Sequence, residues 1–173
     1  MVWNKKQVIL TLFITLLITS CSFSYKFDGG TINYDLTKTI TIHEFPNRAA
    51  MVNTMLSQIL DQELNNRFIE QTRLTPVSAN GDIEISGEIT QYTTQDLGVK
   101  EDTYASMTKL IISVRVDYEN TKEQGQDISG QTFTAYREFD STNTLLSDVE
   151  DELCRQICEE LVDQIYNATV ANW

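Results

Sequence analysis

Three cysteines and one histidine are the residues of this 173-residue chain whose types could carry nucleophilic or metal chemistry. A serine or cysteine nucleophile needs a base within hydrogen-bonding reach, and His43, the only imidazole, has no Cys–His or Ser–His motif near it. The sequence also lacks a G-x-S-x-G motif, a P-loop and a G-x-G-x-x-G motif. It therefore predicts neither an enzyme nor a bound cofactor or metal, and it indicates a binding or assembly protein.

Cys154 and Cys158 lie four residues apart in "ELCRQICEEL", a spacing that places them on one face of a helix. A metal site would need further ligands, and His43 is far away in the sequence. A disulfide across a single helical turn has unfavourable geometry. We therefore favour two small, buried, reduced thiols within an apolar helix face.

The third cysteine, Cys21, ends the apolar stretch "LLITSCSFSYK". Two lysines precede eleven uncharged residues, 8–18, a run that is too short to span a bilayer but has the length of a signal-peptide core. The order Ile18-Thr19-Ser20-Cys21 resembles the bacterial lipobox, in which the cysteine is lipidated and becomes the first mature residue. A plain signal peptide with a coincidental cysteine, or a short buried helix, is the alternative. We predict a signal peptide at 1–20, a lipidated tether at 21–35 and a single domain at 36–173.

The charge balance narrows the class of partner. Thirteen basic against 25 acidic residues give a formal net charge of −12, which disfavours nucleic acid as a ligand. A phosphate or sugar-acid ligand would have to use the few basic residues on or beside the predicted strands, namely Lys100, Lys109, Arg115 and Arg137. The alternative, which we favour, is that these cations pair with strand acids such as Glu84, Glu88 or Asp117.

Hydrophobic periodicity predicts the elements that would position these residues. "KTITIHEF" alternates like a strand, and a helix over 48–73 follows, with Asn47 as its N-cap. Its buried stripe would comprise Val52, Met55, Leu56, Ile59, Leu60, Leu64, Phe68 and Ile69. Three alternating strands follow in "DIEISGEITQY", "TKLIISVRVDY" and "QTFTAYREF".

A second long helix begins between Ser141 and Ser147, where Ser147 and Glu150 fit a capping box. The predicted order is therefore β-α-β-β-β-α. It favours an α+β fold, a two-layer sandwich with both long helices on one face of a four-stranded mixed sheet. The first strand would join the other three in parallel to one of them, across a helical crossover.

Several segments resemble the LptE family of lipopolysaccharide-assembly lipoproteins, in the form found in Bacteroidetes. They are the lipobox, "SYKF", "FPNRAA", "QTRL", "GEITQY", "FTAYREFDST" and "DELCRQICEELVDQIYNATVANW". The resemblance implies two helices on a four-stranded sheet and no catalysis. It also implies a palmitoylated outer-membrane lipoprotein that faces the periplasm, plugs the LptD β-barrel, assists its assembly and helps to deliver lipopolysaccharide to the surface. Lipopolysaccharide itself is a second candidate ligand. The alternative from another class is a free-standing periplasmic lipid- or glycan-binding lipoprotein.

Overall fold

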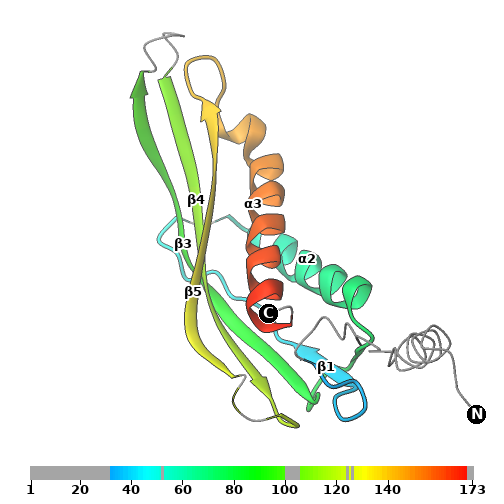
Figure 1. Cartoon of the computed structure of the whole chain (residues 1–173). Coiled ribbons are helices and arrows are strands. Elements are labelled where there is room, and N and C mark those ends of the chain that lie inside the picture. The colour runs from blue at the N-terminus through cyan, green and yellow to red at the C-terminus, as the bar shows by residue number, and fades with distance from the viewer. Residues whose placement is uncertain (1–31, 52, 100–105, 124, 126, 171–173) are drawn as a thin grey trace, which may run out of the picture.

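The computed structural model describes residues 32–51, 53–99, 106–123, 125 and 127–170 (Figure 1). Cys21 and Lys100 lie outside these residues, as do the predicted signal peptide and most of the predicted tether. In chain order the elements are β1 (Thr39–Ile42), α2 (Leu56–Gln71), β2 (Thr75–Pro76), β3 (Ile83–Val99), β4 (Ser106–Asn120), β5 (Ile128–Asp140) and α3 (Leu146–Thr169). The predicted order of two helices and four longer strands is confirmed.

The sheet has five strands in the order β2-β1-β3-β4-β5, so the prediction of four was wrong by one. The additional strand, β2, pairs in parallel with β1 through Thr75 and Pro76. Two residues are too few to show an alternating pattern, which is why the sequence gave no sign of it. β1 also pairs in parallel with β3 across α2, as predicted, whereas β3, β4 and β5 form an antiparallel meander.

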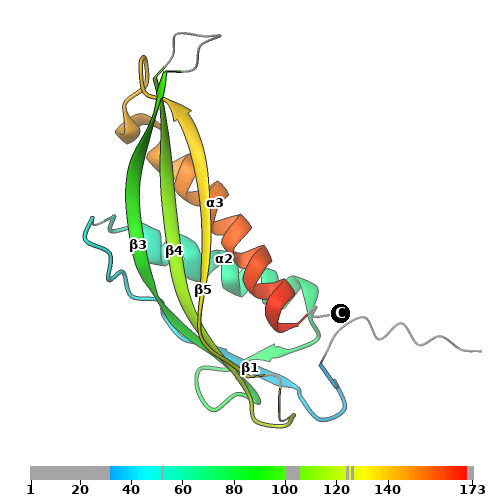
Figure 2. The ribbon, with the colours of Figure 1, turned by 60° about the vertical axis from the view of Figure 1, so that its left-hand side comes forward.

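Both helices cover the same face of the curved sheet, and Figure 2 shows this layer from the side. α3 lies along β4 and β5, and α2 packs mainly against α3 and near β1. The inward residues of the strands are buried as the alternation predicted, and they include Ile83, Ile85, Ile89, Leu110, Ile112, Val114, Val116, Tyr118, Phe133 and Ala135. These apolar side chains and the buried faces of the helices form the core.

A β-bulge and one glycine shape β3. The pairing register shifts between Ile89 and Gln91, so that Ile89 and Tyr92, three residues apart, are both buried. Gly87 lies where a Cβ atom would collide with the Arg115 carbonyl oxygen and the Phe45 ring. Only glycine therefore lets Phe45, which is fully buried, lie against the strand.

α2 begins at Leu56, eight residues later than predicted. Residues 46–48 stay extended because Arg48 donates to the Ile89 carbonyl (2.8 Å) and Ile89 donates to that of Pro46 (3.0 Å). Asn47 accordingly bridges to β3 instead of capping the helix. The Oδ1 atom of Asn53 accepts hydrogen bonds from the N–H groups of Met55 and Leu56, which lack partners within the helix.

The buried face of α2 is narrower than predicted. Leu56, Leu60, Leu64 and Phe68 are fully buried and Ile59 is half-buried, as expected. Met55 and Ile69 are about half exposed, so their assignment to the buried stripe was wrong. Val52 lies outside the described residues.

α3 follows its predicted stripe, with Leu153, Ile157, Leu161 and Ile165 buried. Its predicted capping box was wrong: no side chain caps the first turn, and the Ser147 hydroxyl bonds the Asp148 carboxylate instead. Cys154 and Cys158 are free and buried on this helix, which confirms their interpretation as core thiols.

Candidate interaction surface

The fold leaves uncovered the face of β3, β4 and β5 that points away from the helices (Figure 2). We call it the open face, and its side chains follow from strand register and alternation. They are Glu84, Ser86, Glu88, Gln91, Thr93 and Gln95 on β3, Lys109, Ile111, Ser113, Arg115, Asp117 and Glu119 on β4, and Thr132, Thr134, Tyr136 and Glu138 on β5. Hydroxyls, amides and charges dominate the open face, so it is a polar surface.

The centre of the open face is a hydrogen-bonded row across three strands. Ser113 Oγ lies 3.2 Å from Gln91 Oε1, to which it donates, and 2.8 Å from Thr134 Oγ1. Since a hydroxyl has one proton, Thr134 is the donor in the second bond. Ser113 is only 4% exposed although it faces away from the helices. The row therefore stiffens the centre of the face.

Two of the predicted ligand-binding cations flank this row on β4. Arg115 pairs with the Glu88 carboxylate directly across the strands, as the alternative interpretation expected. Lys109 Nζ lies 4.0 Å from the centroid of the Tyr136 ring, a cation–π contact on a tyrosine that is 47% exposed. The two cations are six positions apart, which corresponds to roughly 20 Å along the strand, too far for both to hold one phosphate.

The third cation, Arg137, lies on the opposite face of the sheet. Its guanidinium pairs with the Glu160 carboxylate of α3 and donates to the carbonyls of Tyr136 (2.8 Å) and Gln156 (3.3 Å). Arg137 thus joins β5 to α3. The structure brings none of the described candidate cations together, and ligand binding at any of them stays a prediction.

The residues that could carry chemistry are not arranged for it. His43 Nε2 lies 3.3 Å from Glu84 Oε2, and both side chains are exposed. Burial raises the pKa of the Cys154 thiol to about 11, so it stays protonated and unreactive at neutral pH. Within the described part of the chain no three His, Cys, Asp or Glu side chains form a potential metal site.

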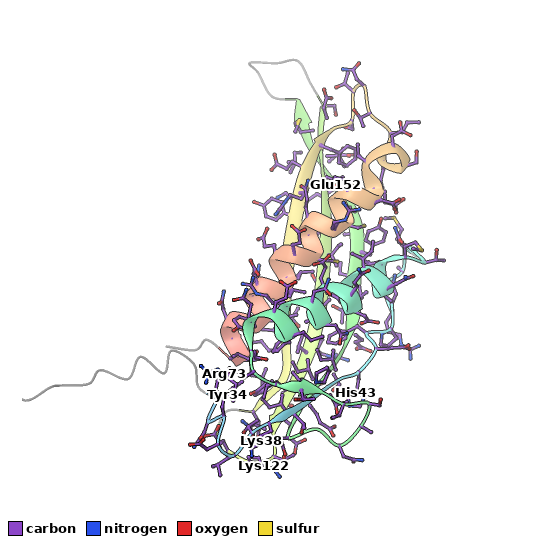
Figure 3. The ribbon with its side chains drawn as sticks, turned by 90° about the vertical axis from the view of Figure 1, so that its right-hand side faces the viewer. Tyr34, Lys38, His43, Arg73, Lys122 and Glu152 are labelled. Carbon is purple, nitrogen blue, oxygen red and sulfur yellow. The ribbon has the colours of Figure 1, made fainter. Side chains whose placement is uncertain are left out.

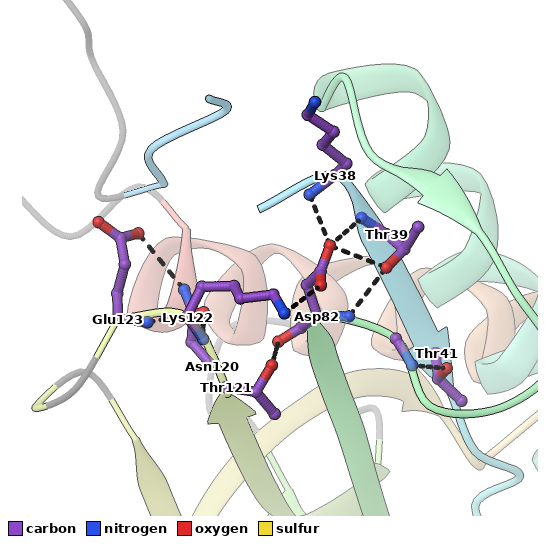
Figure 4. Close-up of polar contacts among 9 residues, drawn as sticks. Lys38, Thr39, Thr41, Asp82, Asn120, Thr121, Lys122 and Glu123 are labelled. Atoms are coloured by element: carbon purple, nitrogen blue, oxygen red, sulfur yellow. Dashed lines mark hydrogen bonds and ion pairs between the residues drawn. The ribbon is translucent and has the colours of Figure 1, made fainter. Parts of the chain in front are cut away.

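Two polar clusters that sequence reasoning missed hold the ends of elements in place. The Asp82 carboxylate accepts hydrogen bonds from the N–H groups of Lys38 (2.9 Å) and Thr39 (3.0 Å) and from Thr39 Oγ1, and it pairs with Lys122 Nζ at 3.2 Å (Figure 4). These hydrogen bonds, chiefly that of the Lys38 N–H, lower the pKa of Asp82 far below its usual value. Asp82 thereby joins the start of β1 to the β4–β5 loop.

The second cluster joins α3, β3 and the segment before α2. The Tyr92 hydroxyl donates to the Glu150 carboxylate, which also accepts a hydrogen bond from Asn53 Nδ2 (2.9 Å). Burial, followed by this bond to Glu150, raises the pKa of Tyr92 well above its usual range. No local sequence signal could reveal either cluster, because each joins segments about 40 or more residues apart in the chain.

Two helices on one face of a curved five-stranded sheet, with a polar open face on the other side, define a two-layer α+β domain. The chain matches the family described as LptE, lipopolysaccharide-assembly, over residues 37–169. It therefore belongs to the LptE family, a non-enzymatic family of lipopolysaccharide-assembly lipoproteins.

Solved structures resemble the fold at low sequence identity. A hypothetical protein of Chlamydia trachomatis is 11% identical, with a TM-score of 0.52 over 77% of this chain and 98% of that one. A homologue of the neuraminyllactose-binding haemagglutinin of Helicobacter pylori is 9% identical, with a TM-score of 0.50 over 82% and 87%. A minor lipoprotein of Acinetobacter baumannii is 19% identical, with a TM-score of 0.48 over 75% and 89%. No curated protein matches the sequence.

Proposed function

We propose that the protein is a lipid-anchored subunit of an outer-membrane lipopolysaccharide translocon. Acyl chains on Cys21 tether it to the inner leaflet of the outer membrane, and the domain faces the periplasm. There it plugs an LptD-like β-barrel, assists the assembly of that barrel and helps to deliver lipopolysaccharide to the cell surface. The observation that carries the proposal is the LptE family match, which spans almost all of the described domain.

The open face is the surface that we assign to the barrel. The lumen of a large membrane barrel is polar, so a guest should present hydroxyls, amides and charges to it rather than apolar side chains. Gln91 and Thr134, which are exposed and are joined through Ser113, supply such a surface on strands that pair along most of their length. Arg115, paired with Glu88, adds charge without leaving a cation unneutralised.

The alternative, a free-standing lipid or glycan carrier, would require an apolar cavity between the helices and the sheet. That space is filled by buried Leu, Ile and Phe side chains. The hollow of about 620 Å³ beside α2 lies at the surface and is lined mainly by polar groups, including Glu44, Ser57, Asp61 and Asn65. These observations favour the translocon subunit.

The test is affinity purification of the C-terminally tagged protein from native membranes in mild detergent, with partners identified by mass spectrometry. We expect one large outer-membrane barrel at about one to one. A variant with Gln91→Lys and Thr134→Lys, at two exposed positions of the open face, should recover less barrel, whereas Glu152→Lys on α3 should recover the wild-type amount. Good recovery of a folded protein without any barrel would reject the translocon role and favour the free-standing binder.

A further inference from the structure

In its second half, β3 forms an edge of the sheet. Figures 1 and 2 show no strand beside this part of β3 on the side away from β4, because β1 pairs only with residues 83–85 and Asn47 only with Ile89. Figure 3, in which Glu152 marks the first turns of α3, shows the ends of β3 and β4 continuing past that helix. We call residues 91–96 the β3 edge.

Strand register determines which backbone groups the β3 edge directs outward. In an antiparallel pair, the N–H and C=O groups of one residue point to the same side, and successive residues alternate. The Ser106 carbonyl accepts a hydrogen bond from Ser141, directly after β5, so residues 109, 111 and 113 of β4 bond β3 instead. These three pair with residues 95, 93 and 91, and consequently Tyr92, Thr94 and Asp96 direct their backbone groups away from the sheet.

These outward groups have almost no hydrogen-bond partners within the described part of the chain. The single contact joins the Thr94 carbonyl to the hydroxyl of its neighbour Thr93 at 3.5 Å, the outer limit for a hydrogen bond. Residues 91 and 94–96 are exposed. Tyrosine and threonine favour extended backbone, and β4 already holds this stretch in the strand conformation. The β3 edge is therefore prepared to accept a further strand.

The other two edges of the sheet are protected, as natural proteins usually protect them. On β5, the Thr134 carbonyl accepts from Gln164 Nε2 of α3 (3.4 Å), and the Tyr136 carbonyl accepts from Arg137 Nη1 (2.8 Å). β2 is only two residues long and contains Pro76, which has no N–H group. The β3 edge contains neither proline nor lysine, and no described helix or strand lies along it (Figure 2).

The charges beside the β3 edge are negative. Asp96 is exposed on the helix side, where it accepts a hydrogen bond from Thr108 Oγ1 (3.0 Å) and forms no ion pair within the described residues. Glu150 of α3 lies beside Tyr92, whose hydroxyl donates to it. The cation nearest in register, Lys109, lies on the other face, one strand further in, with its Nζ against an aromatic ring of β5. A lysine or arginine on the helix side of an added strand would therefore find a carboxylate.

A second copy of this chain fits the β3 edge poorly. Antiparallel pairing of two such edges about Thr94 would place each Asp96 opposite Tyr92 of the other copy, beside Glu150. Like charges that meet across strands destabilise the pairing. The net charge of −12 adds repulsion between whole copies. The β3 edge therefore favours a basic strand from a different protein.

We propose that the β3 edge binds an extended, basic segment of another protein, which joins the sheet as an antiparallel strand. The outward N–H and C=O groups of Tyr92, Thr94 and Asp96 bond the backbone of this segment, and one of its basic side chains pairs with Asp96. Backbone hydrogen bonds supply the affinity in such strand addition, and alternate side chains supply the specificity. The inference concerns the edge of the sheet and does not depend on the proposed translocon role.

The test uses the full chain in detergent, labelled with ¹⁵N, and the synthetic peptide acetyl-Thr-Arg-Thr-Val-Thr-Arg-Thr-amide. Its central valine would face Thr94, and one of its arginines would face Asp96. Amide hydrogen exchange is measured by NMR. In the free protein, residues 92, 94 and 96 should exchange at least about tenfold faster than residues 91, 93 and 95, which bond β4. With peptide at about ten times its Kd, exchange at Thr94 should slow about tenfold, because about one-tenth of the protein remains free.

Two controls separate backbone pairing from charge. A peptide with N-methylvaline lacks the N–H group that would bond the Thr94 carbonyl but keeps the side chain, and it should not slow the exchange. Asp96→Lys should weaken binding of the unmodified peptide about fivefold, since it replaces an attractive cross-strand pair with a repulsive one. Glu119→Lys makes the same change of charge at an exposed position of the open face and should leave the Kd unchanged.

Several results would overturn the inference. They are slow exchange at Thr94 in the free protein, a peptide without measurable binding, and equal slowing by the N-methylated peptide. Protection of Thr94 that rises with protein concentration would assign the edge to a second copy in place of a basic strand. Recovery of a barrel from native membranes is a separate result, so failure of this inference leaves the proposed function standing.

Discussion

At the scale of single residues, the Asp82 carboxylate joins three separate parts of the chain. Asp82 lies directly before β3, where alternation with the buried Ile83 puts it on the solvent side. In the fold it accepts hydrogen bonds from Lys38, which directly precedes β1, and from Thr39, the first residue of β1, and it pairs with Lys122. One side chain thus fixes the start of β1, an element of four residues that could not hold its position alone.

Asp82→Asn should destabilise the protein by about 1–2 kcal/mol at pH 7, since hydrogen bonds to a charged acceptor are worth more than those to a neutral one. The pKa of Asp82 is lowered in the folded state, so its contribution is fully present above its ordinary value of 3.8. It is lost as the pH falls below that value toward the folded pKa. Urea unfolding of both proteins between pH 7 and pH 3 measures this, and the difference should shrink in acid.

Asp35→Asn, which changes an exposed acid nearby, is the control and should alter the unfolding free energy by less than about 0.5 kcal/mol at every pH. A pH-independent difference between wild type and Asp82→Asn would contradict a role for the carboxylate charge.

At the scale of elements, the division of β4 into a buried face and an open face determines how the strands pair and which side of the sheet the helices cover. Every second residue from Leu110 to Tyr118 is buried under α3 and its neighbours, while the residues between them form the open face. Pairing with both β3 and β5 sets this register over almost the whole length of β4. A shift by one residue would turn the apolar set outward, so the burial of one face specifies the pairing.

Val114→Asp should prevent folding, because it places an unpaired carboxylate in the core where Val114 is fully buried. Ile157→Asp should do the same from α3. Thr132→Asp, on an exposed position of β5 next to Arg115, should leave the protein folded. Circular dichroism and thermal melting distinguish these results. A folded Val114→Asp protein would mean that the register of β4 is wrong.

At the scale of the whole molecule, the domain and its attachment to the membrane are separate features. None of the helices within the described residues is long and apolar enough to cross a membrane. The core of the described residues forms between α2, α3 and the sheet from side chains within residues 32–170. Anchorage and folding should therefore be separable by mutation.

Cys21→Ala should move the protein from the membrane fraction to the periplasm without changing its melting temperature. Stable anchoring would need the proposed acyl chains, whereas the core described here is built from residues 32–170. Membrane fractionation and thermal melting of the purified variant measure the two effects. Loss of the folded state in Cys21→Ala would show that the lipidated segment also supports the fold.

Much of the fold could be predicted because its longer elements carry strong periodicity. The apolar stripes of α2 and α3 predicted helices, and the alternation in β3 and β4 predicted strands. The α+β class followed from the order of these helices and strands along the chain. The predictions of secondary structure were wrong where the hydrophobic pattern was weak, or where hydrogen bonds to a distant part of the chain overrode it. β2 is too short to show a period, and the segment before α2 is held extended by Ile89, some 40 residues away. The Ser147 capping box failed because Glu150 instead bonds Tyr92 and Asn53.

The candidate site was less predictable than the fold. Lys109 and Arg115 share a face, as alternation requires. Alternation also places Arg137 on the inner face with Phe133 and Ala135, but its partner Glu160 became evident only once β5 was placed against α3. The sequence by itself determined the longer elements, most of their buried faces and the resemblance to LptE, because these depend on patterns of neighbouring residues, and its composition determined the net charge. Only the tertiary structure decided the contacts of Asp82 and the partner of each cation, because these depend on contacts between residues far apart in the chain.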